Sequence, residues 1–403
     1  MTQSSSPHPA TEMINKPSTV FSAATLLAIA YLIYNMLPLI LGSAADSLGL
    51  NEKQIGYLGS IYMAGSTLSN ISAVFWVRRL DWRKVVFLTT LISASIYAIA
   101  GHLEYNSLLV TFFLLGVTNA SIVSCVLTCL GDTDNPDQSF GYGIGIQVTL
   151  AGIGACLLPI FVVPEWGFQG VMFALAGVAI ASMLLIPRLP KNDAKGAERL
   201  PVANVTKGTG SNGAVCWGIS GMMLYFIGQS GVWAFLERIG IQGGITSGEL
   251  GAIFGITLVL SAAGAFLASA IGTRFGRCWP IIGATVACVA SLYLLPICKT
   301  PWSFGTAVFF YAAAWNFVLP FQMTIITEGD SRGRFTPLIP ACQLLGSAIG
   351  PALAGNLIID GSYAYVYLLA AVTAIISTVI FIATELYLTR RSSDLKAVPL
   401  SSS

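Results

Sequence analysis

Long apolar segments recur along the whole chain, and they constrain its fold more than any other feature. Hydrophobic residues make up 55% of the 403 positions and charged residues only 9%. A soluble globular domain carries about 25% charged residues, so the chain lies far outside that class. Apolar segments of ~18 or more residues are long enough to cross a bilayer as helices. The composition therefore predicts an all-α membrane protein.

Twelve such segments can be drawn, six on either side of a polar interval. We expect membrane-spanning helices at residues 18–42, 54–77, 84–101, 107–130, 139–163, 167–187, 214–236, 249–272, 278–297, 303–326, 335–358 and 364–388. The predicted organisation is two six-helix halves, at residues 18–187 and 214–388, joined by a linker at 188–213. Two tails, at residues 1–17 and 389–403, flank the halves. The Gly, Ser, Thr and Pro content of the linker suits a flexible tether with little fixed structure.

The positions of the basic residues predict the orientation of these helices. All but three of the 20 Lys and Arg residues fall on one side, the exceptions being Lys53, Arg238 and Lys299. Positive charge stays cytoplasmic, so we expect both termini and the linker inside the cell. The first 17 residues are polar and the apolar run that follows is too long for a signal-peptide core, so no cleaved signal is predicted. The expected location is the plasma (inner) membrane, as a multi-pass protein.

The two halves align with one another when the chain is shifted by 195 residues. This offset pairs Gly49 with Gly244, Gly56 with Gly251, and Arg79 with Arg274. Apolar coincidences are common in such a chain, whereas matched glycines at helix ends and matched scarce charges are not. The two halves are therefore interpreted as pseudo-symmetric copies of one six-helix unit.

The loops after the second and eighth predicted helices contain a partial motif. The later loop reads Ser269-Ala270-Ile271-Gly272-Thr273-Arg274-Phe275-Gly276-Arg277 and the earlier one Arg78-Arg79-Leu80-Asp81-Trp82-Arg83-Lys84. With the six-plus-six arrangement, these loops resemble those of the major facilitator superfamily, whose gating motif has a glycine, an Asp-Arg pair and then Gly-Arg. The motif's aspartate is absent from both copies, where Arg78 and Thr273 stand. The drug-exporter signature is also absent, because the fourth helix has no charge and Gly350-Pro351 lies in the eleventh helix instead of the fifth.

The resemblance implies a secondary transporter with a solute site between two rocking halves, lined by helices 1, 2, 4, 5, 7, 8, 10 and 11. Polar side chains are expensive in lipid, so those within these spans should face the bundle interior. The predicted substrate-binding residues are Tyr31, Tyr34, Asn35, Asn119, Gln147, Tyr225, Gln229, Trp233, Trp315, Asn316 and Gln343. The alternative for each is a hydrogen bond between helices. Other tryptophans are expected to anchor the membrane interface, namely Trp76, Trp82, Trp166, Trp279 and Trp302.

The middle third of each predicted span lacks Asp, Glu, Lys, Arg and His. A carrier of organic anions or cations would usually place an opposite charge there. Amides, hydroxyls and aromatic faces instead suit a small neutral, zwitterionic or amphipathic organic solute.

Proton coupling requires a titratable group whose surroundings change between states. The candidates lie near helix ends, namely Glu237, Asp132 and Glu328. Arg238 follows Glu237, so a structural ion pair is the alternative there. If none of the three couples, the protein is a facilitator.

Charges of both signs are predicted to meet at the cytoplasmic face. We expect them to form a gate that closes this face, composed of Arg78, Arg79, Arg83, Asp134, Arg274, Arg277 and Asp330. The simpler alternative is that the basic residues only fix the topology.

The sequence therefore predicts a transporter that works by alternating access and is coupled to protons. We expect it to lie in the lipid bilayer and to function as a monomer. A drug or metabolite efflux antiporter is one alternative, and a non-transporting sensor of the same fold is another. An enzyme is not expected, because no nucleophile–base pair or metal cluster lies within the spans. No cofactor, metal or nucleic acid is predicted.

Overall fold

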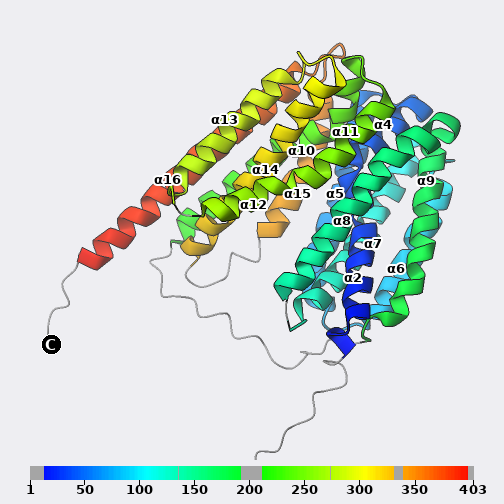
Figure 1. Cartoon of the computed structure of the whole chain (residues 1–403), viewed down its shortest axis with the longest axis horizontal. Helices are drawn as coiled ribbons and strands as arrows, with labels where there is room; N and C mark the ends of the chain where they lie inside the picture. The colour runs from blue at the N-terminus through cyan, green and yellow to red at the C-terminus, as the bar shows by residue number, and fades with distance from the viewer. Residues whose placement is uncertain (1–12, 135, 192–210, 273, 331–338, 398–403) are drawn as a thin grey trace, which may run out of the picture. The chain divides into compact units, whose positions relative to one another are not determined.

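The computed structural model describes residues 13–134, 136–191, 211–272, 274–330 and 339–397 (Figure 1). Its regular structure in these ranges is helical, apart from the isolated bridges Arg274–Gly276 and Ile359–Ser362. The chain divides into two compact units, Met1–Arg199 (unit 1) and Leu200–Ser403 (unit 2). The predicted all-α fold is confirmed.

Unit 1 begins with a first helix that is interrupted twice. Its helices are α2 (Pro17–Ala30), α3 (Leu32–Asn35), α4 (Leu37–Leu48), α5 (Glu52–Trp76), α6 (Trp82–Ala100), α7 (Tyr105–Gly131), α8 (Pro136–Leu157), the π-helical turn η1 (Leu158–Val162), α9 (Val163–Ser182) and the 3-10 helix η2 (Met183–Arg188). A turn at Gly167, with φ 51°, separates the fifth predicted span from the sixth inside α9.

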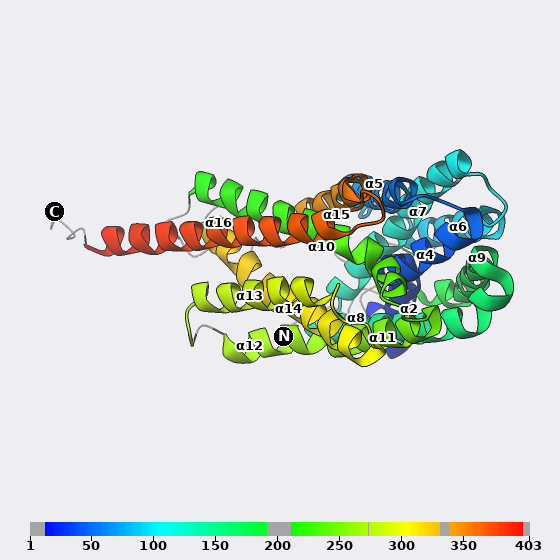
Figure 2. The same ribbon diagram turned by 90° about the horizontal axis from the view of Figure 1, so that it is seen from above.

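Unit 2 has the same order of helices. They are α10 (Asn212–Gln242), α11 (Ser247–Leu260), α12 (Ala262–Ile271), α13 (Cys278–Leu294), α14 (Pro301–Gly329), α15 (Ile339–Leu357) and α16 (Ala364–Ala397). Figure 2 shows α16 running alongside α10.

Helix occupies most of every predicted span within the described residues, with short turns at some span ends. Six helical stretches in this part of the chain are long and apolar enough to cross a membrane, at Trp82–Ala100, Tyr105–Gly131, Ser139–Arg188, Asn212–Gln242, Pro301–Gly329 and Ala364–Arg391. The first and eighth predicted spans are divided into shorter helices, and each piece is too short to be counted as a membrane-spanning helix. The number of membrane crossings and the side of the termini stay predictions.

The internal repeat is visible in the geometry of the helix starts. Asn51 caps α5 in a capping box with Gln54, and Thr246 caps α11 in a capping box with Glu249, 195 residues later. The preceding glycines, Gly49 and Gly244, have φ angles of 64° and 88°, a region that favours glycine. The same local signals thus start the second helix of each unit.

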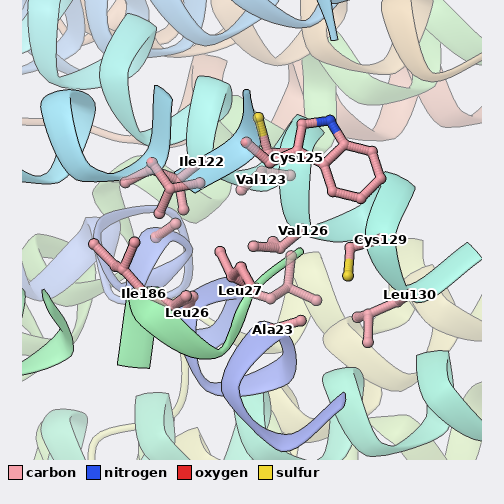
Figure 3. Packing of buried hydrophobic residues seen from close by; sticks show 14 residues of the cluster. Ala23, Leu26, Leu27, Ile122, Val123, Cys125, Val126, Cys129, Leu130 and Ile186 are labelled. Carbon is pink, nitrogen blue, oxygen red and sulfur yellow. The ribbon is translucent and has the colours of Figure 1, made fainter. Parts of the chain in front are cut away.

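The core of unit 1 lies where α2, α6, α7 and η2 meet. Figure 3 shows side chains from these segments packed together, among them Leu26, Leu27, Val126 and Ile186. Trp82 belongs to this core at 1% exposure, and its indole N–H donates to the carbonyl of Val77 at 2.6 Å. The expectation of an interface anchor is wrong for Trp82, because Asp81 caps α6 and the helix starts two residues earlier than predicted, which brings the ring inside.

The two ends of the predicted linker are held by their own units. The carbonyl of Lys191 accepts a hydrogen bond from the backbone N–H of Trp82 at 3.0 Å, and the carbonyl of Arg188 accepts from the Thr19 hydroxyl at 3.0 Å. At the other end, Ser211 caps α10 and its N–H donates to the carbonyl of Gly329 at 3.1 Å. The expectation of little fixed structure is wrong for these ends, and residues 192–210 lie outside the described residues.

Candidate functional site

The first helix of unit 1 is interrupted at the residues predicted to bind substrate. Tyr31 has ψ −1°, and Met36 has φ −101° and ψ 17°, so both depart from ideal helical geometry. Pro38 has no N–H, which leaves the carbonyl of Tyr34 without its helical donor. Interrupted helices in transporters lie where the backbone lines a cavity. Tyr31 and Tyr34 meet edge to face at this point, with ring centroids 5.8 Å apart.

Asn35 lies beside these tyrosines in the sequence and is 7% exposed. Its amide nitrogen Nδ2 has no hydrogen-bond partner among the described residues. A buried donor left unpaired costs roughly 1–3 kcal/mol, so such a group favours a ligand or water that satisfies it. Asn35 is therefore a predicted site residue of unit 1 that carries an unsatisfied buried donor.

Two further tyrosines extend this polar region, and sequence reasoning missed both. Tyr31 and Tyr34 lie close enough to Tyr62 on α5 to interact electrostatically with it, and Tyr62 interacts in the same way with Tyr97 on α6. Tyr62 and Tyr97 are buried at 2% and 4% exposure. The signal in the sequence that could have indicated them is a tyrosine hydroxyl within an apolar span, because a buried tyrosine usually finds a polar partner.

Asn119 on α7 is the partner that these two tyrosines share. Its Nδ2 donates to the Tyr97 hydroxyl at 3.0 Å and to the Tyr62 hydroxyl at 3.5 Å, while its Oδ1 accepts from the Ser93 hydroxyl at 3.1 Å. The amide of Asn119 is thus fully engaged in joining α5, α6 and α7, which favours a packing role over substrate contact. Gln147, another predicted contact, lies half-buried on α8.

In unit 2 the corresponding amide is Gln229 on α10, which is fully buried. Its Oε1 accepts from the Cys288 thiol at 3.4 Å, and its backbone carbonyl accepts from the Tyr311 hydroxyl at 2.7 Å. Its Nε2 has no partner in the part of the chain that the structure describes. Gln229 therefore presents an unsatisfied donor, as Asn35 does in unit 1.

A chain of aromatic rings continues from Tyr311. Trp315 lies 6.3 Å from Tyr311 and 5.5 Å from Phe226, and Phe226 lies 6.2 Å from Tyr225, measured between ring centroids. Edge-to-face contacts of this kind hold the ring positions. Tyr225 and Trp315 were predicted, whereas Phe226, Tyr311 and the Cys288 thiol were missed because they look like ordinary packing residues in the sequence.

The remaining candidates of unit 2 have internal partners. The Asn316 amide donates to the carbonyl of Ser261 at 3.3 Å, where α11 gives way to α12. Gln343 donates to the sulfur of Met222 at 3.5 Å. Trp233 lies at a tilt to Phe254, with centroids 6.1 Å apart. The structure thus gathers Tyr225, Gln229 and Trp315, and it uses the Asn316 amide to hold an interrupted helix.

The repeat relates the unsatisfied amides of Asn35 and Gln229. An offset of 195 pairs Tyr34 with Gln229 and Asn35 with Ser230, so the two amides stand one position apart in equivalent helices. Each unit thus places an unpaired side-chain N–H at the same level of its first helix, with tyrosines nearby.

Two of the three proton-coupling candidates are held by arginine. Arg78 donates to the Asp132 carboxylate through Nη1 at 2.8 Å and Nη2 at 3.0 Å within unit 1. In unit 2, Arg277 forms a two-point ion pair with Glu328 and also contacts Glu385 at 3.3 Å. The Glu328 carboxylate raises the pKa of Arg277 above its usual value. The third candidate, Glu237, is buried in α10 at 3% exposure.

Several residues of the predicted gate are engaged within their own units. The guanidinium of Arg83 donates to the carbonyl of Leu189, and the N–H of Asp134 donates to the side chain of Asn15 at 2.8 Å. Asp330 is buried at 5% exposure. The side chains of Arg79 and Arg274 are exposed and form no ion pair with the described residues.

Comparison with known proteins identifies the fold. A family model described as Major Facilitator Superfamily matches residues 23–332 and, in a second match, residues 218–401. The chain belongs to the Major Facilitator Superfamily. It is therefore a multi-pass membrane transporter, and the resemblance in the sequence is confirmed.

Solved structures of this superfamily share the fold at low sequence identity. A mutant of the nucleoside transporter NupG is 13% identical, with a TM-score of 0.71 over 91% of this chain and 99% of its own. A bacterial homolog of the human lysosomal transporter Spinster, inward-facing and occupied, is 14% identical, with a TM-score of 0.66 over 93% and 96% of the two chains. A search of curated proteins gave no match.

Proposed function

We propose that this superfamily member is a proton-coupled secondary transporter of a small neutral, zwitterionic or amphipathic organic solute, acting as a monomer in the plasma membrane by alternating access. The observation that carries the solute class is that Asn35 and Gln229, two of the predicted site residues, are buried and each has an unsatisfied amide nitrogen. An amide N–H donor satisfies a carbonyl, hydroxyl or ring nitrogen of the solute without requiring a charge.

The surroundings of both amides support this class. Tyrosines accompany Asn35, and aromatic rings lie near Gln229, so the two sets offer hydrogen bonds and flat apolar contact. A polar solute with an apolar or planar part would suit either set. The other proposed solute contacts are Tyr31, Tyr34, Tyr225, Trp233 and Trp315. Gln147, Gln343, Asn119 and Asn316 are proposed to support the site from the surrounding helices.

For proton coupling we propose Glu237. Glu237 is a carboxyl buried at 3% exposure on α10, the helix that also carries Gln229, so a movement of this helix between states would change its surroundings. Glu237→Gln should abolish solute-driven proton uptake in liposomes while solute exchange continues. Wild-type proton movement in this variant would remove Glu237 from the mechanism.

For the cytoplasmic gate we propose Arg79 and Arg274, two exposed arginines at equivalent positions of the repeat. Charge reversal at both, followed by cysteine crosslinking at the cytoplasmic face, tests this role. Unchanged closure of that face would leave them as topology determinants only.

The solute class is tested by thermal-shift binding with the purified protein against nucleosides, sugars, amino acids, aromatic acids and amphipathic drugs. Nucleosides are included because one structural neighbour is a nucleoside transporter. We expect stabilisation by a neutral or zwitterionic compound, and a loss of affinity of about 2–10-fold in Asn35→Ala and in Gln229→Ala, the value of one hydrogen bond. Stabilisation by organic anions alone would overturn the proposal.

A further inference from the structure

We propose that unit 2 binds an anionic phospholipid in a groove between α10 and α16, with the headgroup at Arg390 and Arg391. The groove has a volume of about 480 Å³. Its walls come from the first turns of α10 and from the facing stretch of α16. The lining residues include Ser211, Gly213, Ala214, Trp217, Ala383 and Tyr387.

The groove lies beside a close contact between α10 and α16. At Gly221 a Cβ would lie 3.0 Å from the side chain of Ile380, so the helices are in close contact there. Nearer the start of α10, small residues leave space between the two helices, namely Gly213, Ala214 and Ala383. The groove is thus a consequence of side-chain size.

The equivalent place in unit 1 is closed by the protein itself. The Thr19 hydroxyl donates to the carbonyl of Arg188 at 3.0 Å, and an offset of 195 residues pairs these two positions with Ala214 and Ala383. Leu189, at 1% exposure, packs into the core next to this contact. Ala214 has no hydroxyl, so the donor of this hydrogen bond is absent from unit 2 and no such contact closes the groove.

The apolar part of the groove suits an acyl chain. Val379, Ile380 and Ala383 line it from α16, and Trp217, 65% exposed, lines it from α10. In a membrane transporter, an apolar cavity on an exposed helix face is filled by the hydrocarbon that surrounds it, because water is absent there. Trp217 and Tyr387 are also the residue types that lie at the level of lipid headgroups.

The polar end of the groove is complementary to a negative headgroup. Arg390 and Arg391 follow Tyr387 by three and four residues on α16, so the three side chains share one side of this helix, and Arg390 is exposed. The N-terminus of α10, capped by Ser211, adds positive partial charge. The carboxylate of Glu385 contacts Arg277 at 3.3 Å and does not line the groove. Basic residues at this level attract anionic lipids, whereas a headgroup without net charge would leave them uncompensated.

The proposal is tested by native mass spectrometry of the full chain purified from vesicles of equal phosphatidylglycerol and phosphatidylcholine. The wild type should retain phosphatidylglycerol selectively. Arg390→Gln with Arg391→Gln should lose about tenfold or more of this preference, since each basic residue near an anionic surface contributes to binding. Ala383→Phe, which fills the groove, should release the lipid without lowering the unfolding temperature.

A matched control removes two exposed lysines of unit 1, Lys16→Gln with Lys191→Gln, and should keep the preference. Equal retention of both lipids by the wild type would overturn the headgroup assignment. Unchanged phosphatidylglycerol retention in Ala383→Phe would overturn the site. If the wild type is a dimer and Ala383→Phe is not, the groove is occupied by a second copy of the chain instead of a lipid, which also overturns the proposal. The readout is lipid mass, so it does not depend on the solute or on transport.

Discussion

The guanidinium of Arg78 and the carboxylate of Asp132 form a two-point ion pair that joins the end of α5 to the end of α7. Asp132 is 4% exposed, whereas the Arg78 side chain is 43% exposed. Arg277 and Glu328 make the corresponding connection in unit 2, between the loop after α12 and the end of α14. Each unit thus fixes the same pair of helix ends with an arginine.

Arg78→Gln should destabilise the protein, because it leaves the buried carboxylate of Asp132 without its two-point partner. Removing one partner of a buried ion pair costs roughly 3–5 kcal/mol, and the partial exposure of Arg78 reduces the expected loss to about 1–3 kcal/mol. Thermal unfolding in detergent measures it. The neighbouring Arg79→Gln is the control, and equal unfolding temperatures for the two variants would contradict the prediction.

Gly350→Ala should disrupt the packing of α15 on α10. A Cβ at this position would clash with the Ser230 hydroxyl and the carbonyl of Ile227, and it would lie 2.9 Å from the backbone nitrogen of Gly231. Overpacking of this kind costs typically ~1–3 kcal/mol, and here two of the clashing atoms belong to the backbone and cannot rotate away. Gly283→Ala is the control, since a Cβ there meets nothing within 4 Å. The prediction fails if both variants unfold at the wild-type temperature.

Asn119→Ala should lower stability, in contrast to Asn35→Ala. The first variant removes the amide that the buried hydroxyls of Tyr97 and Tyr62 share, at a cost of roughly 1–3 kcal/mol. The second removes an amide nitrogen that already lacks a partner among the described residues. Unfolding temperatures measured without solute separate the two. A larger drop for Asn35→Ala would mean that Asn35 has the structural role instead.

The orientation of the chain can be tested with two of its own cysteines. Cys216 is exposed near the start of α10, and Cys298 is half-buried in the turn after α13. The charge distribution predicts that they face opposite sides, with Cys216 towards the cytoplasm. Variants that keep only one of them should react with an impermeant maleimide from opposite sides of the membrane. Labelling of both from the same side would refute the predicted topology.

The helices and their repeat were predictable because they depend on local signals. Apolar length, the glycines Gly49 and Gly244 and the spacing of the two halves can all be read from short stretches of sequence. The interruptions at Tyr31 and Ser261 were not predicted, because the flanking residues are as apolar as those of a continuous helix. Trp82 was misplaced because the cap at Asp81 starts the helix early and outweighs the interfacial preference of the ring.

The roles of the polar residues were less predictable for a different reason. Asn35, Asn119 and Gln229 look alike in the sequence, and each lies in an apolar span. What separates them is whether another helix supplies an acceptor for the amide N–H, as α6 does for Asn119 through Tyr97. Such pairing depends on tertiary packing, so a sequence can nominate these residues without ranking them.

The anchored ends of the linker have a practical consequence for protein engineering. Lys191 is tied to unit 1 and Ser211 to unit 2, so the bonds that hold these ends do not depend on a continuous chain between them. The gene can therefore be divided within the interval from 192 to 210 and expressed as two polypeptides. Isotopic or fluorescent labels could then be introduced into one fragment alone, which would give each pseudo-symmetric half its own spectroscopic signal.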